Sequence, residues 1–208
     1  MGASVLNAID PREALTILGC SKGKNRGGDA SGGTGTVWSE TMLRARAGVL
    51  ARSRVDDGGL RPAWLRYTGH FYRNVGPALG EAVENGRTLI LSGGYGILRA
   101  DEPISYYDRK LKLGDWPSGV LEDAVLGEAR RISATKVVTF VSASADYAKL
   151  IRRIPWGGTE FSAVLVTMDF HGGGAQIEVP RRLARAFSAW WRRSPSDYPP
   201  GMVTEVLG

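Results

Sequence analysis

The chain is poor in the residues that form metal clusters and covalent cross-links. Its 208 residues include 1 cysteine, Cys20, and 2 histidines, His70 and His171. A single cysteine excludes a disulfide within the chain, and it excludes the cysteine-rich ligand sets of structural zinc sites. The spacing of histidines and carboxylates indicates neither a metal nor a cofactor.

Long apolar runs are absent as well. No stretch reaches the roughly 20 apolar residues that a membrane-spanning helix needs. The N-terminal segment also lacks the basic and apolar regions of a secretion signal. We therefore expect a cytoplasmic protein without a membrane partner.

Positive charge is the first feature that is present. The sequence has 27 Lys and Arg against 21 Asp and Glu, a formal net charge of +6. This balance suits an anionic partner, either nucleic acid or a phosphorylated, nucleotide-like small molecule. Arginine-rich proteins are often basic without binding nucleic acid, so the charge alone leaves both interpretations open.

Short apolar segments alternate with segments of helical periodicity. The apolar segments predict strands at 15–18, 87–91, 136–141 and 161–168. The periodic segments predict helices at 38–55, 70–85 (or only from Pro77 on), 118–133, 144–153 and 179–193. Asp56-Asp57-Gly58-Gly59 is expected to end the first helix, and Pro180 to lie in the first turn of the last.

This alternation predicts the fold class. The strands are apolar throughout, which is typical of a sheet covered by helices on both faces. We predict one compact α/β domain over residues 1–208, with a mixed, mostly parallel sheet. We also expect a mobile glycine-rich loop at 25–36 and an extended C-terminal tail from residue 194.

The segment 92–110 follows a predicted buried strand and is dense in polar and aromatic groups. Gly93 and Gly94 permit close approach of the backbone to a ligand. Tyr95 and Tyr106 can stack on a nucleobase or hydrogen-bond to it. In open α/β sheets ligands lie beyond the carboxyl ends of the strands, so this segment is the first candidate for a binding site.

Two carboxylates in this segment are candidates for chemistry. Asp101 or Glu102 can act as a general acid or base, or stabilise charge that develops on a sugar during glycosidic cleavage. The alternative is that Asp101 caps a turn and that Glu102 is solvated.

The loop after the first predicted strand is the second candidate. It contains Cys20, Ser21, Lys22 and Lys24, and a loop with glycines, a hydroxyl and lysines at a strand end suits an anion such as phosphate. It lacks the spacing of a P-loop, and a solvated basic turn is the alternative. Cys20 is either a nucleophile activated by the lysines or a small buried residue.

Three further segments have two interpretations each. The aromatic residues of 67–72 can stack on a base or pack in the core. Ser144 can hold a phosphate at a helix N-terminus or only cap that helix. The last predicted helix, with its arginines and tryptophans, can lie on a phosphate backbone or place its tryptophans in the core and its arginines in solvent.

One ordered set of motifs matches a known pattern. Residues 91–99 read Leu-Ser-Gly-Gly-Tyr-Gly-Ile-Leu-Arg, with Asp101, Ile104 and Tyr106 after them. Residues 19–24, 67–72 and 144–147 complete the set. Together the motifs resemble the YaaA family of peroxide-stress proteins and its smaller relatives, which have Leu-Ser-x-x-Tyr-Gly-Leu-Leu-Arg followed by an acidic residue, Ile and Pro-Tyr. Here Ser105 stands at the proline position.

The resemblance implies a compact α/β fold, a cytoplasmic location and a connection with DNA, which YaaA-type members are thought to bind with a helix-hairpin-helix in the first half. Residues 38–66 are short and hold one predicted helix and no such hairpin. The pocket motif therefore transfers to this chain better than duplex binding does. A retained pocket implies a ligand of nucleotide or nucleobase size.

We predict that the strand ends gather these residues into one pocket that binds and processes a nucleotide, nucleoside or nucleobase, with N-glycosidic cleavage as the candidate reaction. The alternatives are a non-catalytic DNA-binding stress-response protein and a biosynthetic enzyme for another small polar substrate. The candidate catalytic residues are Asp101, Glu102 and Tyr95. The candidate ligand-binding residues are Cys20, Ser21, Lys22, Lys24, Tyr67, Tyr72, Ser92, Gly93, Gly94, Tyr106, Ser144 and Tyr147.

Overall fold

The computed structural model describes residues 2–29, 38–143 and 145–208. The strands are β1 (Leu15–Gly19), β2 (Arg54–Pro62), β3 (Thr88–Ser92), β4 (Gly96–Arg99), β5 (Pro103–Asp108), β6 (Lys136–Phe140), β7 (Ser162–Met168) and β8 (Met202–Leu207). The helices are α1 (Gly2–Asn7), α2 (Glu40–Ala51), α3 (Ala63–Arg66), α4 (His70–Asn74), α5 (Ala78–Glu84), α6 (Val120–Arg131), α7 (Asp146–Arg153) and α8 (Ala175–Trp191). Short 3-10 turns lie at Leu113–Asp115, Trp156–Gly158 and Pro195–Asp197.

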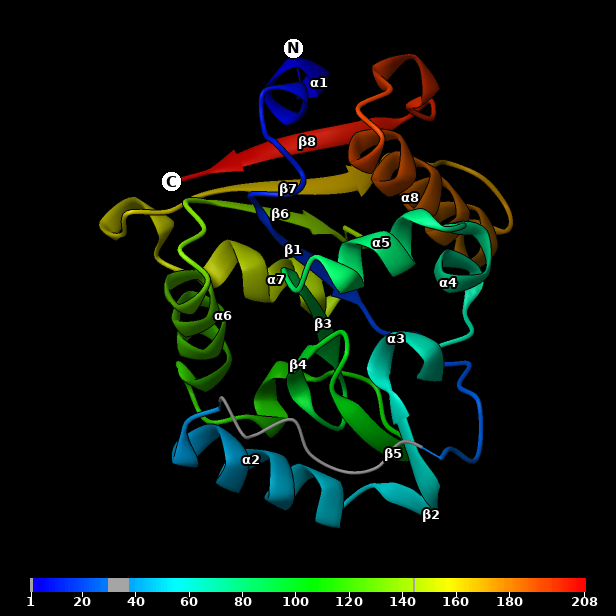
Figure 1. Ribbon diagram of the computed structural model, residues 1–208, viewed down its shortest axis with the longest axis vertical. Coiled ribbons are helices and arrows are strands. Elements are labelled where there is room, and N and C mark those ends of the chain that lie inside the picture. Colours follow the sequence, from blue (N-terminus) through cyan, green and yellow to red (C-terminus); the bar gives the residue numbers. More distant parts are fainter. Residues whose placement is uncertain (1, 30–37, 144) are drawn as a thin grey trace.

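A six-stranded sheet with the order β4-β3-β1-β6-β7-β8 organises the molecule, and β2 pairs with β5 beside it. The inner strands β3, β1, β6 and β7 run parallel, while β4 and β8 pair antiparallel at the two edges. In Figure 1 the arrowheads of β6 and β7 accordingly point to the same side and that of β8 to the other. The predicted single α/β domain with a mixed, mostly parallel sheet is confirmed.

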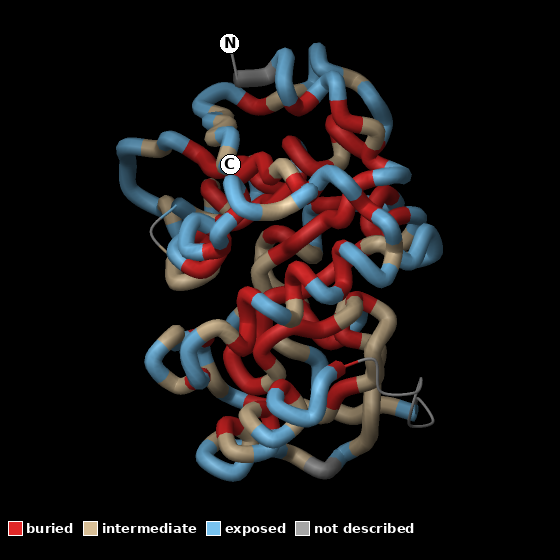
Figure 2. Tube along the Cα trace, turned by 90° about the vertical axis from the view of Figure 1, so that its left-hand side faces the viewer, coloured by how far each residue is buried: buried red, intermediate tan, exposed pale blue. Residues whose placement is uncertain are grey.

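The sheet buries both of its faces because its strands are apolar at successive positions. Side chains of one parity, such as Leu18, Val138 and Val164, join the core under α4, α5 and α8. Their neighbours Ile17 and Val137 join a second core under α2, α6 and α7. Figure 2 shows the buried chain running through the middle of the molecule with exposed segments outside it. The expected helical cover of both faces is therefore confirmed.

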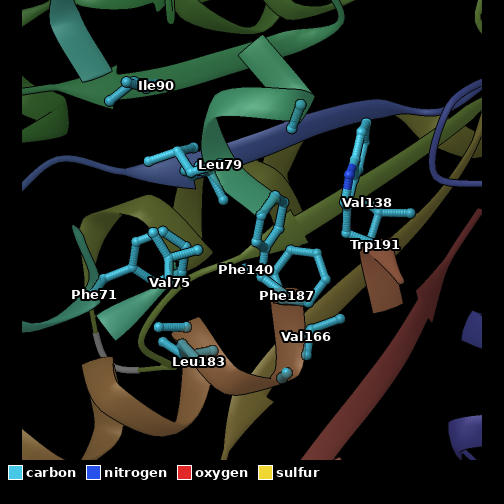
Figure 3. Packing of buried hydrophobic residues seen from close by; sticks show 14 of the residues in the cluster. Phe71, Val75, Leu79, Ile90, Val138, Phe140, Val166, Leu183, Phe187 and Trp191 are labelled. Carbon is cyan, nitrogen blue, oxygen red and sulfur yellow. The ribbon is translucent and has the colours of Figure 1, made fainter. Parts of the chain in front are cut away.

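Aromatic rings fill the first of these cores (Figure 3). Phe187 of α8 meets Phe140 of β6 edge-on, with ring centroids 5.5 Å apart, and it stacks with Trp191 at 6.3 Å. Trp190 is 1% exposed and lies against the same Phe140 ring at 5.4 Å. The tryptophans of α8 are core residues, so they are not available to a partner as the nucleic-acid interpretation of this helix would require.

Long-range pairing explains the elements that the sequence pattern missed. The predicted helix 38–55 ends at Ala51, and Asp56 lies within β2, which pairs antiparallel with β5. The segment 92–110 forms the strands β4 and β5 rather than an open loop. The predicted helix 70–85 is divided into α4 and α5, because Gly76 takes a φ of +64° just before Pro77.

The C-terminal third also differs from the prediction. The last helix begins at Ala175, so Pro180 lies inside it rather than in its first turn. The predicted extended tail contains a 3-10 turn and then β8, which pairs with β7 along six residue pairs from Ala163 to Met168. Most of the predicted glycine-rich loop, from residue 30 on, lies outside the described residues. Across the described ranges, no helix is both long enough and apolar enough to cross a membrane.

The turn between β3 and β4 requires glycine for packing. A Cβ at Gly94 would lie 2.6 Å from the Tyr107 ring, and a Cβ at Gly93 would overlap the backbone of Arg109 and Lys110. These glycines let β5 pack closely against the turn.

We therefore expect Gly94→Ala to lower the free energy of unfolding by about 1–3 kcal/mol through overpacking. Gly48→Ala is the matched control, because Gly48 lies in α2 and a Cβ there would meet no atom within 4 Å. That control should raise stability by about 0.5–1 kcal/mol. Denaturant unfolding measures both, and equal stabilities of the two variants would contradict the packing role.

Candidate functional site

The strand order creates a natural place for a ligand between β1 and β6. After β1 the chain continues to β3 on one side of it, whereas after β6 it continues to β7 on the other side. Connections that diverge from neighbouring parallel strands leave a crevice beyond their carboxyl ends. Residues 20–24 follow β1 at these strand ends, and Val141 and Ser142 follow β6.

A cavity of about 480 Å³, here called the switch-point cavity, occupies this crevice. Its apolar wall comes from α4, β6 and α8, through Phe71, Phe140 and Leu183. Other lining residues carry polar or charged groups: Ser21, Lys22, His70, Arg73, Ser142 and Gln176. An apolar wall with a few convergent polar groups is typical of a small-molecule site.

A second cavity of about 330 Å³, the adjoining cavity, opens beside the first. The two share lining residues from the loop after β1 and from α7, namely Cys20, Ser21, Lys22 and Tyr147. The adjoining cavity is otherwise lined by Lys24, Asp108, Arg109, Lys110, Leu111, Ala145 and Asp146. Its lining is rich in basic residues.

Tyr147 lines both cavities, and other tyrosines are hydrogen-bonded nearby. The Cys20 Sγ and the Tyr147 hydroxyl are hydrogen-bonded at 3.0 Å. The Tyr107 hydroxyl is hydrogen-bonded to both the Tyr67 hydroxyl and the Ser92 Oγ, at 2.8 Å each. Side chains from β3, β5 and α7 thereby support the loop that follows β1.

That loop is held in place by the segment 67–72. The backbone N–H of Gly69 donates to the Ser21 Oγ at 3.0 Å, and the Ser21 hydroxyl donates to the Gly23 carbonyl. The Tyr72 hydroxyl donates to the Gly19 carbonyl at 2.9 Å. Lys24 and Tyr67 form an antiparallel backbone bridge. The loop therefore has a defined conformation before any ligand binds.

Burial shifts the pKa values of this cluster. Desolvation raises the pKa of Tyr67, Tyr72 and Tyr107 well above the usual tyrosine range, and the nearby Cys20 adds to each shift. The pKa of Tyr147 is raised for the same reasons. These hydroxyls are therefore neutral hydrogen-bond donors and acceptors around neutral pH.

The structure brings together the predicted residues of the loop after β1 and of the tyrosine cluster. Cys20, Ser21, Lys22 and Tyr147 line both cavities. Lys24 lines the adjoining cavity and Tyr72 the switch-point cavity. Tyr67 and Ser92 line neither cavity and are hydrogen-bonded to the Tyr107 hydroxyl.

Asp101 and Glu102 do not join this site. β4 pairs antiparallel with β3, so it carries the chain back to the amino end of β3 before Asp101. There Asp101 pairs with Arg99 at 2.9 Å, and Glu102 pairs with Arg46 at 2.5 Å and accepts a hydrogen bond from the Trp38 indole. The prediction of one pocket that includes Asp101 is corrected accordingly.

Tyr95 and Tyr106 are also placed elsewhere. The Tyr95 hydroxyl accepts the backbone N–H of Ser105 at 3.0 Å, and the ring lies edge-on to Tyr107. The Tyr106 ring lies under the Arg26 guanidinium at 4.8 Å. Neither tyrosine lines either cavity, and Gly93 and Gly94 serve the packing of β5. Ser144 lies outside the described residues.

Arg73, His70 and Gln176 are polar cavity residues that were not among the predicted site residues. Gln176 lies at the start of α8, which begins four residues before the predicted start at 179. The signal that could have found Arg73 is its place in the turn of α4 that follows the matched 67–72 segment. Within the described ranges, no group of three or more His, Cys, Asp or Glu could hold a metal ion.

Comparison of the chain with family models and with curated proteins gives no match. The resemblance to the YaaA family remains a prediction that rests on the motifs.

The tyrosine cluster predicts a specific alkaline response. The unfolded chain ionises its tyrosines from about pH 10 upward, whereas Tyr67, Tyr72, Tyr107 and Tyr147 stay protonated in the fold. Their contribution is fully present below about pH 10 and is lost above it, by about 1.4 kcal/mol per pH unit for each tyrosine. Denaturant unfolding measured from about pH 8 to about pH 11, on either side of the ordinary tyrosine pKa, should show this decline. The free energy of unfolding of Tyr72→Phe should fall less steeply with pH.

The absorbance of tyrosinate supplies the control. In denaturant all 7 tyrosines should titrate together, while the native protein should hold these four back until it unfolds. Early ionisation of all tyrosines with the fold intact would contradict the burial of the cluster.

Proposed function

We propose that this protein binds a nucleotide, nucleoside or nucleobase in the switch-point cavity. The observation that carries the proposal is the cavity of about 480 Å³ at the crevice between β1 and β6, apolar on one wall and polar on the others. This is the position at which open α/β sheets bind their ligands, and the volume lies within the usual range for small-molecule sites.

The lining supports a division of roles. A flat base would pack against Phe71, Phe140 and Leu183, which are all buried. Ser142 and Gln176 carry donors and acceptors suited to the edge of a base or to a ribose. The lysine and the arginine of this lining would favour a ligand with negative charge.

The reaction depends on a different set of groups from the one that the sequence indicated. Among the described residues, no carboxylate lines the switch-point cavity, so an acid–base step would fall to His70 or to the Cys20–Tyr147 pair. Ligand binding is therefore the core of the proposal, and turnover of an N-glycosidic bond is its extension.

Blocking the mouth of the cavity tests the proposal. Gln176→Trp would place an indole at the cavity lining, while Ile177→Trp adds the same bulk at an exposed position that does not line it. Calorimetry against nucleobases, nucleosides and nucleotides should show binding that Gln176→Trp weakens about tenfold or more, equivalent to about 1.4 kcal/mol. Ile177→Trp should bind as the unaltered protein does, and equal effects of the two variants would overturn the proposal.

One surface observation favours a second candidate, a non-catalytic nucleic-acid-binding protein. A groove of about 580 Å³ lies between α8, the α4–α5 turn and the C-terminal prolines, and it includes Arg181, Arg182, Arg185 and Arg192. We call these four residues the arginine groove. Arg181 pairs with Glu178, whereas the Arg182 and Arg185 guanidinium groups donate to backbone carbonyls. This leaves a basic surface suited to a phosphate backbone.

Charge reversal tests this candidate. Arg192→Glu should weaken binding of a short duplex or single strand and reduce the dependence of log K on log salt by about 1 for the lost phosphate contact. Arg44→Glu is the control, because it makes the same charge change at an exposed side chain of α2, which does not line the groove. Fluorescence anisotropy over a salt series measures both, and identical salt slopes for the two variants would exclude the groove.

A further inference from the structure

Lys24 carries a charge that the protein compensates poorly. Its side chain is half-buried, and burial lowers the pKa of its ammonium despite the raising influence of Cys20 and Asp108. The Nζ lies 4.3 Å from the centroid of the Tyr107 ring, and it donates one long hydrogen bond, at 3.4 Å, to the Lys22 carbonyl. Within the described part of the chain, no carboxylate forms an ion pair with it. A desolvated ammonium normally has an anionic partner.

The surroundings of Lys24 add further positive charge. Lys22 and Lys110 line the same adjoining cavity and form no ion pair among the described residues. The other charged groups there are engaged, since Arg109 pairs with Asp115 and Asp146 pairs with Lys149. Asp108 is the one remaining carboxylate in the described lining. The cavity therefore favours an anion.

The backbone contributes in the same direction. The helix α7 begins at Asp146, and Ala145 and Asp146 both line the adjoining cavity. The capping position is occupied by Ala145, whose methyl side chain accepts no hydrogen bond. An oxyanion in this cavity would meet the positive end of the helix as well as the lysines.

We propose that the adjoining cavity is an oxyanion subsite that takes the phosphoryl group of a ligand whose nucleoside part occupies the switch-point cavity. This inference rests on the proposed function and deepens it, because it names nucleoside phosphates as the ligand class. The two cavities share the lining residues Cys20, Ser21, Lys22 and Tyr147, so they adjoin closely enough for one ligand to span both across these residues. Lys24 is the central phosphate-binding residue.

The experiment compares ligands that differ only in the phosphoryl group. Calorimetry is performed with the four ribonucleosides, their 5′-monophosphates and inorganic phosphate, on the unaltered protein and on Lys24→Gln. We expect a monophosphate to bind about tenfold or more tightly than its nucleoside, as charge-assisted hydrogen bonds predict. Lys24→Gln should remove most of that difference and change the nucleoside affinity by less than about twofold.

Two further variants keep the test decisive if Lys24→Gln folds poorly. Lys110→Gln alters an exposed lining residue outside the tyrosine cluster and should weaken the monophosphate alone, by about threefold. Lys136→Gln is the matched control, because Lys136 is the first residue of β6, at the end of the strand away from the cavities. This variant should leave all affinities unchanged.

The outcomes separate the subsite from the proposed function. Equal affinity for nucleoside and monophosphate in the unaltered protein overturns the subsite and leaves nucleoside binding intact. Inorganic phosphate that binds through Lys24 with no nucleoside binding supports the subsite as a site for free phosphate and contradicts the proposed function. Equal losses in the Lys110 and Lys136 variants overturn the subsite.

Discussion

A buried arginine fixes the loop on which the candidate site depends. Arg66 is 0% exposed, and its guanidinium donates to the carbonyls of Asn25 and Gly27 at 2.7 Å, of Ile104 at 2.8 Å and of Gly59 at 2.9 Å. These carbonyls belong to the loop after β1, to β5 and to β2, so one side chain joins three segments that are distant in sequence. Carbonyl dipoles take the place of a carboxylate partner, and loss of the guanidinium would leave them unpaired in the interior.

The second constraint is the direction of β4. Because β4 is antiparallel to β3, the chain leaves the carboxyl end of β3 at Ser92 and returns to the amino end of β3 before Asp101. The carboxylates of this segment then anchor β4 and α2 through Arg99 and Arg46. The chain comes back to the site along β5, where Tyr107 reaches Ser92. The same short segment therefore supplies both a structural ion-pair cluster and Tyr107, whose ring lies 4.3 Å from the Nζ of the cavity residue Lys24.

This reversal explains how far the sequence could predict the molecule. The buried parallel strands were predictable, because an apolar run such as 88–91 is enough to indicate a strand that is covered on both faces. The residues after β1 were predictable as a site because ligands bind beyond the carboxyl ends of strands, and the strand itself was predicted. The pairing of β2 with β5 and the antiparallel β4 depend on contacts between distant residues, which no local pattern carries. Proximity in sequence to Ser92, at the carboxyl end of β3, therefore placed Asp101 in the predicted pocket.

The distribution of charge then narrows the chemistry of the site. Glu102 is paired with Arg46 and Asp146 with Lys149, whereas Lys22 and Lys24 line the adjoining cavity and form no ion pair among the described residues. A site with cations, neutral tyrosines and a thiol is better suited to holding an anionic ligand than to protonating a leaving base through a carboxylic acid. If the site transfers protons, the hydrogen-bonded Cys20 and Tyr147 stand at the junction where they would reach the ligand. Anion recognition is thus the property from which any reaction here would have to be built.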